Sequence, residues 1–449
     1  MIRRITRLAT VAIVGAAALM GPTATAAPAP VVKHCRLPAA GRPFTTATPA
    51  QERLDGARVT AAVDQLSVRM RLSVQVFRND CLVAADPLDA LTGTAHNNLW
   101  SVTKSVTSML TGIAIGQGRL TLDAPIGRYL PTGPGWGDRA HRAITVRQLL
   151  TQTSGIDESI LAEAATTGLD PSLPQEALAQ PIKHAPGTHF EYSQLGPALL
   201  AYVVQRAVGE NLATYAQREL FGPIGITRGS YLWLEDRSGT PYGYSNLFLT
   251  PTQLARLGLL MQDGGRWNGR QVVPAAYVDE VGRATATNGC YGLLFWTNAG
   301  TSCTGANIPA AQTVHRRMIP TAPSDAYEMN GTGGQLNVMI PSLHMTVTTT
   351  GYFGDRSPDP SILLGATPGD MQYTFFRTLM SAVEDVDVPD PGPYPGDPID
   401  LDADPMNYLS PFVLRRDLLA SPTCNVVVCN GTVPTKGLLD AVRALPGLA

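Results

Sequence analysis

The chain is organised around the stretch Leu99-Trp100-Ser101-Val102-Thr103-Lys104-Ser105-Val106. It places Ser101 and Lys104 three residues apart, where apolar residues begin to recur with helical spacing. Residues three apart share one face of a helix, so we expect the Lys104 amine beside the Ser101 hydroxyl. A Ser hydroxyl needs a base to become a good nucleophile, and a Lys serves as that base when burial or nearby cations lower its pKa. The helix N-terminus also favours a developing anion.

This stretch also has a purely structural interpretation, in which Ser101 caps a helix and Lys104 is solvated. A Ser-x-x-Lys pattern occurs by chance in many helices, so the motif alone is weak. Here Lys104 lies among Val102, Val106 and Met109 and not in a run of charges, which favours the catalytic interpretation. Which of the two interpretations holds depends on whether other catalytic groups occur elsewhere in the chain.

The composition indicates a globular protein without a nucleic-acid surface. The 449 residues suffice for a large core and two or three domains. Hydrophobic residues make up 44% and charged residues 16%, which is typical of a folded and not a disordered chain. The formal net charge of -2 indicates no nucleic-acid partner.

The first 26 residues have the pattern of a secretory signal peptide. Arg3, Arg4 and Arg7 precede an apolar run over residues 11–20, and Ala24-Thr25-Ala26 follows it. This order predicts cleavage after Ala26 and a secreted or cell-envelope protein. The alternative is an N-terminal membrane anchor, but the apolar run is too short to span a bilayer comfortably. We expect no membrane span after removal of the signal.

The cysteines predict disulfides and no metal site. The chain has six of them, Cys35, Cys81, Cys290, Cys303, Cys424 and Cys429. An even number in an exported protein implies disulfides, although several connectivities are open. We favour the pairs closest in sequence, 290–303 and 424–429, which leaves 35–81. No Cys-x-x-Cys or His-x-x-x-His spacing is present and the seven His are scattered, so we expect neither a metal nor another cofactor.

The periodicity places strands at both ends of the main body and helices between them. A leader rich in Pro, Ala and Thr covers residues 27–50. Strands are expected over 72–77, 81–85, 291–296, 335–341 and 345–350. Helices are expected over 51–70, 101–117, 146–151, 196–209, 212–220, 251–262 and 373–383. This order predicts an α/β fold with a sheet built from both ends and an inserted helical subdomain over about residues 125–270.

The end of the chain differs from the rest. Residues 385–404 are dense in Asp and Pro, which favours an extended linker. The remainder of 385–449 has some apolar content and the last two cysteines, and is either a small appendage or a strap over the body. The hydrolase-like body is therefore expected over residues 51–384.

Two further elements supply what a Ser101–Lys104 hydrolase needs. Tyr192, in Phe190-Glu191-Tyr192-Ser193-Gln194, is a candidate proton carrier if cations hold its pKa down. The stretch Asn330-Gly331-Thr332-Gly333-Gly334-Gln335 opens a strand and offers close backbone approach and free N–H groups for an oxyanion. Each is alone more often a packed aromatic or a turn, and it is their order along one chain that favours a site.

With these elements in place, the chain resembles the serine β-lactamase and D,D-peptidase superfamily. It is most similar to the class C β-lactamase-like hydrolases, which include family VIII carboxylesterases, D-aminopeptidases and 6-aminohexanoate-dimer hydrolases. Ser101-Val102-Thr103-Lys104 matches their nucleophile motif. The supporting stretches are residues 118–125, 149–155, 186–193, 249–258 and 291–296. The resemblance covers roughly residues 50–383 and implies an antiparallel sheet flanked by helices with an all-helical domain, the site lying between them.

The resemblance also implies site roles and shows two departures. Tyr192-Ser193-Gln194 looks like the Tyr-x-Asn element of these hydrolases, with Gln194 in place of Asn. Met329-Asn330-Gly331 falls where they carry Lys-Thr-Gly or His-x-Gly, and the oxyanion N–H carried over is that of Thr332. A thioether at Met329 cannot hold a substrate carboxylate, which favours substrates without one.

The leading hypothesis is an exported serine hydrolase that cleaves esters or amides of a small-molecule or peptide substrate through an acyl-enzyme. One alternative is a D,D-peptidase or β-lactamase acting on peptidoglycan peptides or penicillins. Another is a non-catalytic relative that binds the cell wall. An α/β-hydrolase is disfavoured because no Gly-x-Ser-x-Gly is present. The oligomeric state is left open.

Overall fold

A six-stranded antiparallel sheet with the order β2-β1-β13-β12-β11-β8 runs through the computed structural model. The model describes residues 32–157, 168–305, 313–352 and 369–395, together with Cys424 and Cys429. The strands of this sheet are β1 (Arg71–Arg78), β2 (Cys81–Ala85), β8 (Trp296–Thr297), β11 (Tyr327–Gly331), β12 (Gln335–Ile340) and β13 (Met345–Gly351). The strands come from both ends of the body, which confirms the predicted arrangement.

Turn residues and alternation explain the two hairpins of the sheet. Asn79 and Asp80 join β1 to β2 with φ values of 48° and 64°, the left-handed conformation that short hairpin turns require. In β1, Val74 and Val76 point into one hydrophobic cluster and Phe77 into another. Because successive side chains of a strand face opposite ways, the sheet has a core on each side.

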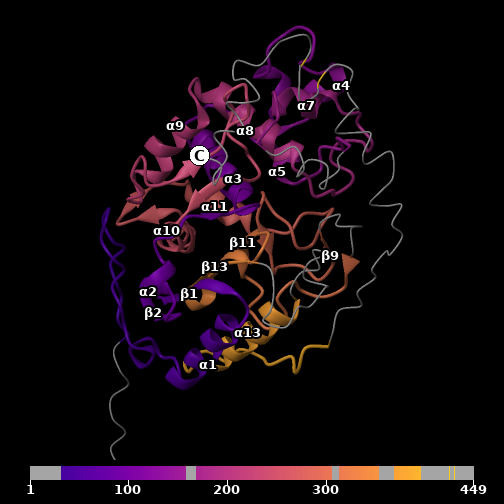
Figure 1. Ribbon diagram of the computed structural model, residues 1–449. Helices are drawn as coiled ribbons and strands as arrows, with labels where there is room; N and C mark the ends of the chain where they lie inside the picture. Colours follow the sequence, from indigo (N-terminus) through magenta and orange to yellow (C-terminus); the bar gives the residue numbers. More distant parts are fainter. Residues whose placement is uncertain are drawn as a thin grey trace, which may run out of the picture. The chain divides into compact units, whose positions relative to one another are not determined.

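Helices cover both faces of the sheet (Figure 1). The helices α1 (Gly56–Ser67) and α13 (Gly369–Ser381) pack together against one face. On the other face lie α10 (Pro251–Gln262), which contacts β12 and β13, and α3 (Val102–Gly116), which contacts β11. Thr250 and Gln253 form a capping box at the start of α10, which explains why this helix begins where the sequence predicts.

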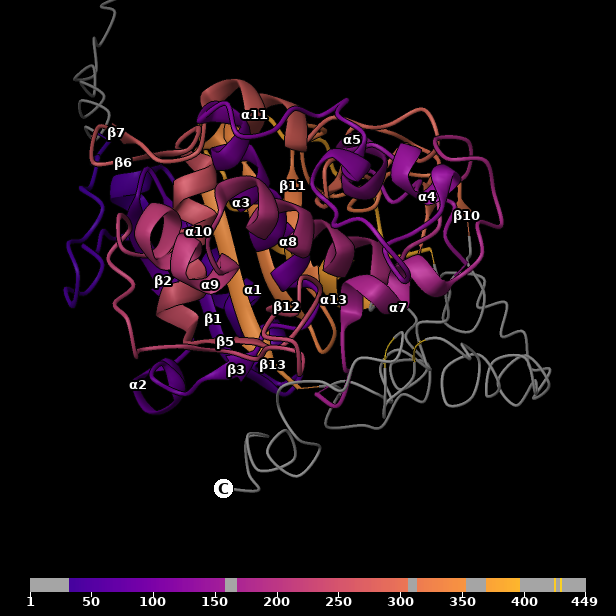
Figure 2. The same ribbon diagram turned by 90° about the horizontal axis from the view of Figure 1, so that it is seen from above.

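Most of the remaining helices lie between α3 and α10 in the sequence. They are η2 (Ile126–Arg128), α4 (Arg139–Ala143), α5 (Val146–Leu150), α7 (Leu173–Ala179), α8 (Leu195–Val208), α9 (Leu212–Ala216) and the π-helical η3 (Gln217–Phe221). Figure 2 shows α8 beside α3, and α8 also packs on α5 and α7. The helix that bears Ser101 is therefore held between the sheet and the helical region.

Short elements complete the described chain. The helical ones are η1 (Pro49–Glu52), α2 (Asp89–Thr92), α11 (Ala275–Val281) and η4 (Pro341–Leu343). The strands are β3 (Asn97–Asn98), β4 (Leu232–Trp233), β5 (Leu247–Leu249), β6 (Arg266–Trp267), β7 (Arg270–Gln271), β9 (Cys303–Thr304) and β10 (Thr313–Val314).

Two expected elements differ in the structure. The strand expected over 291–296 is wrong except for its last residue, since only Trp296 and Thr297 pair as a strand. Leu294 has a φ of 57° and donates its N–H to the carbonyl of Leu150, so the chain turns there instead of extending. The helix expected over 51–70 is split, because Arg53 takes a left-handed φ of 58° and Asp55 caps a new helix.

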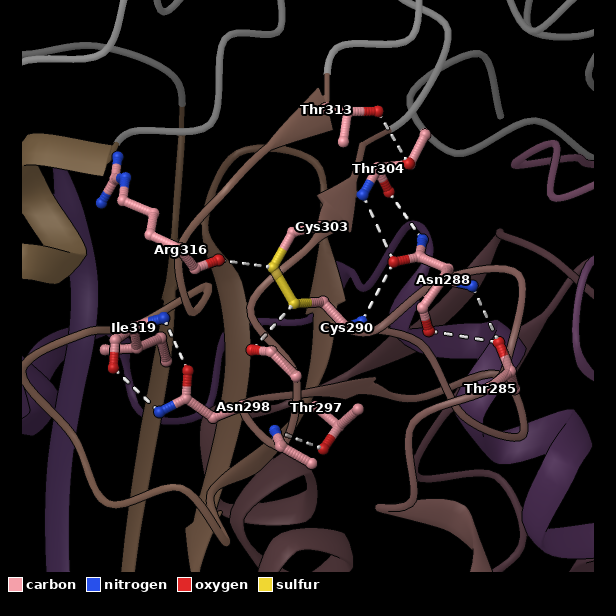
Figure 3. Close-up of a disulfide and its surroundings, with 12 residues drawn as sticks. Thr285, Asn288, Cys290, Thr297, Asn298, Cys303, Thr304, Thr313, Arg316 and Ile319 are labelled. Carbon is pink, nitrogen blue, oxygen red and sulfur yellow. Dashed lines mark hydrogen bonds between the residues drawn. A yellow bond between two sulfur atoms is a disulfide. The ribbon is translucent and has the colours of Figure 1, made fainter.

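All three disulfide pairs agree with the pairing favoured from the sequence: Cys35–Cys81, Cys290–Cys303 and Cys424–Cys429. Figure 3 shows the second of these beside Asn288, whose amide oxygen accepts the N–H groups of Cys290 and Thr304 at 3.0 and 3.3 Å. Disulfides of this kind persist in oxidising compartments, which indicates an extracellular protein.

Other expectations concern the ends of the chain. The expected signal peptide, residues 1–26, lies outside the described residues, as does most of 385–449. Apart from Cys424 and Cys429, the described part is residues 385–395. This segment contacts α13, where Arg377 pairs with Asp390 at 2.7 Å and the Tyr373 hydroxyl donates to the carbonyl of Gly392 at 3.0 Å. Within the described ranges, no helix has the length and apolarity needed to cross a bilayer.

Candidate active site

Ser101 is presented by a sharp turn of the backbone between β3 and α3. Trp100 adopts a left-handed φ of 46°, and its N–H donates to Oδ1 of Asn98 at 3.0 Å. The amide of Asn98 is held in turn by Asn246, to which it donates at 3.1 Å. Ser101 occupies the N-cap position of α3, yet its side chain makes no capping hydrogen bond. Its hydroxyl is thus available to groups outside the helix backbone.

Lys104 lies next to Ser101, as the spacing predicts. Its Nζ donates to Ser101 Oγ at 3.0 Å and also to Oε1 of Gln194, at the N-cap of α8. Lys104 is 1% exposed, so its amine is removed from bulk water. The solvated-Lys interpretation of the motif is therefore wrong. A buried amine in hydrogen-bond contact with a hydroxyl has the geometry that a general base needs.

Tyr192 completes a group of three side chains. The Lys104 Nζ is 4.4 Å from the centroid of the Tyr192 ring, and the Tyr192 hydroxyl hydrogen-bonds with Ser101. Burial raises the pKa of Tyr192 above its ordinary value of 10, although the bond to Ser101 lowers it in part. The condition considered from the sequence, that cations hold this pKa down, is not fulfilled, because burial is the main influence on it. The phenol keeps its proton at neutral pH and is suited to donating it.

Aromatic rings form the surroundings of Tyr192. Trp296 stacks on it with 5.5 Å between ring centroids, and Tyr291 meets it edge-on at 6.0 Å. Tyr244 is also near Lys104, with its ring centroid 5.7 Å from Nζ. We call the rings of Tyr291 and Trp296 the aromatic wall. Tyr291 directly follows Cys290, so the Cys290–Cys303 disulfide and the Asn288 hydrogen bonds (Figure 3) hold the start of the segment that carries both rings.

The strand β11 passes next to the backbone of Ser101. A Cβ atom at Gly331 would collide with the carbonyl oxygen of Leu99 and lie 3.2 Å from the N of Val102, so only Gly fits there. Thr332 follows Gly331 and is exposed. The predicted oxyanion segment is therefore near the nucleophile, and the role of the Thr332 N–H stays a prediction.

Met329 lies on the same face of β11 as Gly331 and is completely buried. Its sulfur is 3.9 Å from Nδ2 of Asn337, and it belongs to the core that also contains α3. This position accepts an apolar side chain without a charged partner. The structure thus brings Ser101, Lys104, Tyr192 and Gln194 into contact and places Gly331 beside them.

Sequence reasoning missed Gln152, Asn98 and Tyr244 as members of this region. Gln152 lies inside the stretch 149–155 that carries part of the resemblance, which was the available signal. Asn98 and Tyr244 carry no local pattern that marks them. Asn98 contacts Asn246, 148 positions away in the sequence. Tyr244 approaches Lys104, which lies on a helix far from it in the sequence.

Comparisons with known proteins identify relatives of parts of this chain. The chain is 32% identical over 161 residues to the Esterase EstB of Burkholderia gladioli, a match that covers 32% of this chain and 41% of the relative. It is 29% identical over 141 residues to Protein flp of Staphylococcus aureus (strain N315), covering 30% of this chain and 28% of the relative. The matched part is thus less than half of either curated relative.

A solved structure extends the likeness to most of the body. A Bacillus anthracis protein provisionally named a 6-aminohexanoate-dimer hydrolase superimposes with a TM-score of 0.55 at 15% identity, covering 78% of this chain and 90% of that one. At this identity the likeness shows the fold alone. The Beta-lactamase family model matches residues 85–350, more than half of the sequence, and the chain therefore belongs to the Beta-lactamase family of serine hydrolases.

Proposed function

We propose that this protein is an exported serine hydrolase that cleaves an ester or amide bond through an acyl-enzyme on Ser101. The observation that carries the proposal is the 3.0 Å hydrogen bond from Lys104 Nζ to Ser101 Oγ, made by an amine that is 1% exposed. A buried Lys in contact with a Ser hydroxyl at a helix start is one arrangement that can activate a nucleophile for covalent catalysis.

The proposed reaction begins with acylation. Ser101 Oγ attacks the substrate carbonyl carbon while its proton passes to the neutral amine of Lys104. The carbonyl oxygen becomes an oxyanion between the N–H groups of Ser101 and Thr332. Tyr192 then gives its proton to the leaving alcohol or amine as the carbonyl–heteroatom bond breaks, and it recovers a proton from Lys104.

Deacylation reverses these roles. A water molecule attacks the acyl carbon and loses its proton to the Tyr192–Lys104 pair, and Ser101 Oγ leaves with a proton from the same pair. The products are a carboxylic acid and the free enzyme, so protons and atoms balance over the cycle. No cofactor is needed for these steps.

The substrate class follows from the charges near Ser101. Met329 supplies no cation to hold a substrate carboxylate, which favours neutral acyl groups over penicillins and peptides ending in a carboxylate. The similarity to Esterase EstB supports an ester substrate. Export is proposed from residues 1–26 and is supported by the disulfides, since these persist outside the reducing cytosol.

Kinetics of three variants test the proposal. Wild type should react with a fluorophosphonate probe at Ser101 and hydrolyse p-nitrophenyl esters of short acids. Ser101→Ala, Lys104→Ala and the double variant should each lose several orders of magnitude in kcat/KM, and the double variant little more than either single one, because residues that act as a unit are non-additive. Circular dichroism of each variant checks that it is folded.

Three results would contradict the proposed function. If Ser101→Ala keeps near-native turnover of any substrate that the wild type hydrolyses, the nucleophile lies elsewhere. If a folded wild type neither reacts with the probe nor turns over short-chain esters, D-amino acid amides or nitrocefin, the protein is a non-catalytic binder. Nitrocefin turnover above ester turnover would identify a β-lactamase instead.

A further inference from the structure

We propose that Gln152 is the positioning residue that holds Tyr192 in place to protonate the leaving group. The proposal rests on the function proposed above and goes beyond it, because Gln152 acts through Tyr192 and not on the substrate. The observation behind it is a set of hydrogen bonds from Gln152 to the backbone of the residues on both sides of Tyr192.

The side-chain amide of Gln152 pairs with the backbone N–H and C=O of one residue in the Tyr192 loop, which belong to two consecutive peptide groups. Its Nε2 donates to the carbonyl of Ser193 at 3.3 Å, and its Oε1 accepts the N–H of Ser193 at 3.2 Å. Both functional groups of the amide are thus used on the residue that directly follows Tyr192. Gln152 is 2% exposed, so these bonds do not compete with bulk water.

The backbone of Gln152 holds the other side of the same loop. Its carbonyl accepts the N–H of Glu191 at 3.0 Å, and Glu191 directly precedes Tyr192. The residue thereby fixes the chain before and after Tyr192, which restricts the φ and ψ of the tyrosine. The phenol direction is then set relative to α3, where its hydroxyl hydrogen-bonds with Ser101.

Gln152 also acts on the ring of Tyr192 through Tyr291. The Gln152 side chain hydrogen-bonds with Tyr291, whose ring meets that of Tyr192 edge-on at 6.0 Å. Tyr291 itself is 1% exposed, and its ring centroid lies 4.8 Å from that of Trp296, the ring that stacks on Tyr192. One amide therefore links the backbone of the loop to the aromatic wall that supports the phenol.

The backbone conformation of Gln152 indicates that this placement is costly to form. Its φ of 57° is in the left-handed region, which a residue with a Cβ adopts only when its surroundings hold it there. A turn alone would be served better by Gly at this position. The amide side chain gives a reason for a Gln here, since packing alone would need no polar group in a buried site.

The experiment compares two esters of one acyl group. An ethyl ester needs a proton on its leaving alkoxide, whereas a p-nitrophenyl ester releases a stable anion without one. Tyr192→Phe should reduce kcat/KM for the ethyl ester about 100-fold or more, with a much smaller loss for the p-nitrophenyl ester. Gln152→Ala should show the same selective loss, about 10-fold or more, and the double variant should lose little beyond Tyr192→Phe.

A second variant tests the positioning role through the pH dependence of ethyl-ester activity, which a purely structural role of Gln152 would not change. In Gln152→Glu, a protonated carboxyl can donate to the Ser193 carbonyl and accept its N–H as the amide does, whereas a carboxylate cannot donate. Its ethyl-ester activity relative to wild type should therefore recover as the pH falls. This variant also keeps the side-chain volume, so it remains informative if Gln152→Ala fails to fold.

The matched control is Thr153→Val, a nearly isosteric change at the next residue. Thr153 is 4% exposed and its hydroxyl contacts Thr151 at 2.9 Å. This control should keep the wild-type ratio of ethyl-ester to p-nitrophenyl-ester activity. Selective loss in Gln152→Ala with recovery of Gln152→Glu at low pH supports the proposal.

The outcomes distinguish the role of Gln152 from the proposed hydrolase mechanism. If Tyr192→Phe loses ethyl-ester activity but folded Gln152→Ala and Gln152→Glu keep the wild-type ratio at every pH, the positioning role is refuted and the proposed hydrolase stands. If Ser101→Ala retains turnover, or Tyr192→Phe leaves the ratio unchanged, the proposed mechanism itself fails and the role of Gln152 fails with it.

Discussion

At the scale of single residues, Gln194 and Met329 distinguish this site from the pattern that the chain resembles. Gln194 reaches Lys104 directly, so the longer amide still serves the proposed base. Met329 contributes volume and no charge, and it is buried against Asn337 on the face of β11 that bears Gly331. The proposed nucleophile and its proposed base are thus in contact, while no cation stands at the position where the resemblance implies one that would recognise an anionic substrate.

Substituting Met329→Lys should raise acylation by penicillins relative to hydrolysis of neutral esters. An ammonium two residues before Gly331 on the same face of β11 can form a charged hydrogen bond with a substrate carboxylate, worth about 1.5–3 kcal/mol, or roughly 10- to 150-fold. Met329→Leu, which conserves volume, is the control. An unchanged penicillin-to-ester ratio in a folded Met329→Lys protein would show that this position does not face the substrate.

At the scale of elements, β11 links the site to the opposite face of the sheet. Gly331 lies against the start of α3, whereas Glu328 points the other way and is fully buried. The Glu328 carboxylate accepts hydrogen bonds from Asn330 at 2.7 Å and from Gln372 of α13 at 3.1 Å. Burial raises the pKa of Glu328 from 4.5 to about 7, and these two hydrogen bonds oppose the rise. A buried acid therefore ties β11 to α13.

The stability of the fold should depend on pH through Glu328. The folded state holds this proton up to about pH 7 and the unfolded state only to 4.5, so the stabilising contribution is complete below 4.5 and is lost as the pH rises through 7. Relative to Glu328→Gln, wild type should lose up to about 3 kcal/mol of unfolding free energy between about pH 4 and about pH 8. Urea unfolding of both proteins measures this difference.

Glu384→Gln, the same substitution at an exposed residue, is the control for this measurement. The difference in unfolding free energy between this variant and wild type should stay the same over this pH range. A difference between wild type and Glu328→Gln that stays constant over this range would mean that the folded protein does not hold the Glu328 proton more tightly than the unfolded chain does.

At the scale of the whole molecule, covalent links join distant parts of the described chain. Cys35–Cys81 ties the N-terminal segment to the hairpin of β1 and β2, and Arg256 of α10 holds the same segment by donating to the carbonyls of Pro38 and Arg42 at 3.0 Å. Cys290–Cys303 instead braces the segment next to the aromatic wall. The two links are thus expected to serve stability and activity differently.

Removing each disulfide should separate these roles. Cys35→Ala/Cys81→Ala opens a sequence separation of 46 and should cost about 4 kcal/mol, whereas Cys290→Ala/Cys303→Ala opens one of 13 and should cost about 3 kcal/mol. The second variant should lose more kcat/KM, because Tyr291 and Trp296 flank Tyr192. Urea unfolding and ester hydrolysis measure both effects.

Mass mapping of non-reduced protein recovered from outside the cell should find no free thiol. Six alkylatable thiols there would contradict the three pairs.

In the disulfide-removal experiment, equal activity losses in the two double variants would contradict the separate role of the link near the aromatic wall.

The sequence by itself determined the features that depend on neighbouring residues. The spacing of Ser101 and Lys104, the capping box of α10 and the left-handed Asn79-Asp80 turn are local, because helix faces and short turns involve residues within a few positions. The hydrophobic periodicity also indicated a sheet assembled from both ends of the body, since it reports which face of each element is buried. From these came the fold and the proposed nucleophile with its proposed base.

Only the tertiary structure decided which distant residues support that pair. The segment 291–296 reads as a strand from its composition, yet Leu294 is turned by its hydrogen bond to Leu150, a contact that no local pattern encodes. The burial that raises the pKa of Tyr192 is likewise a property of the assembled core. Gln152 meets Ser193 across 41 positions in the sequence. Its role follows from the packing of two loops, because a side chain's partners are set by where the fold brings the backbone and not by its neighbours along the chain.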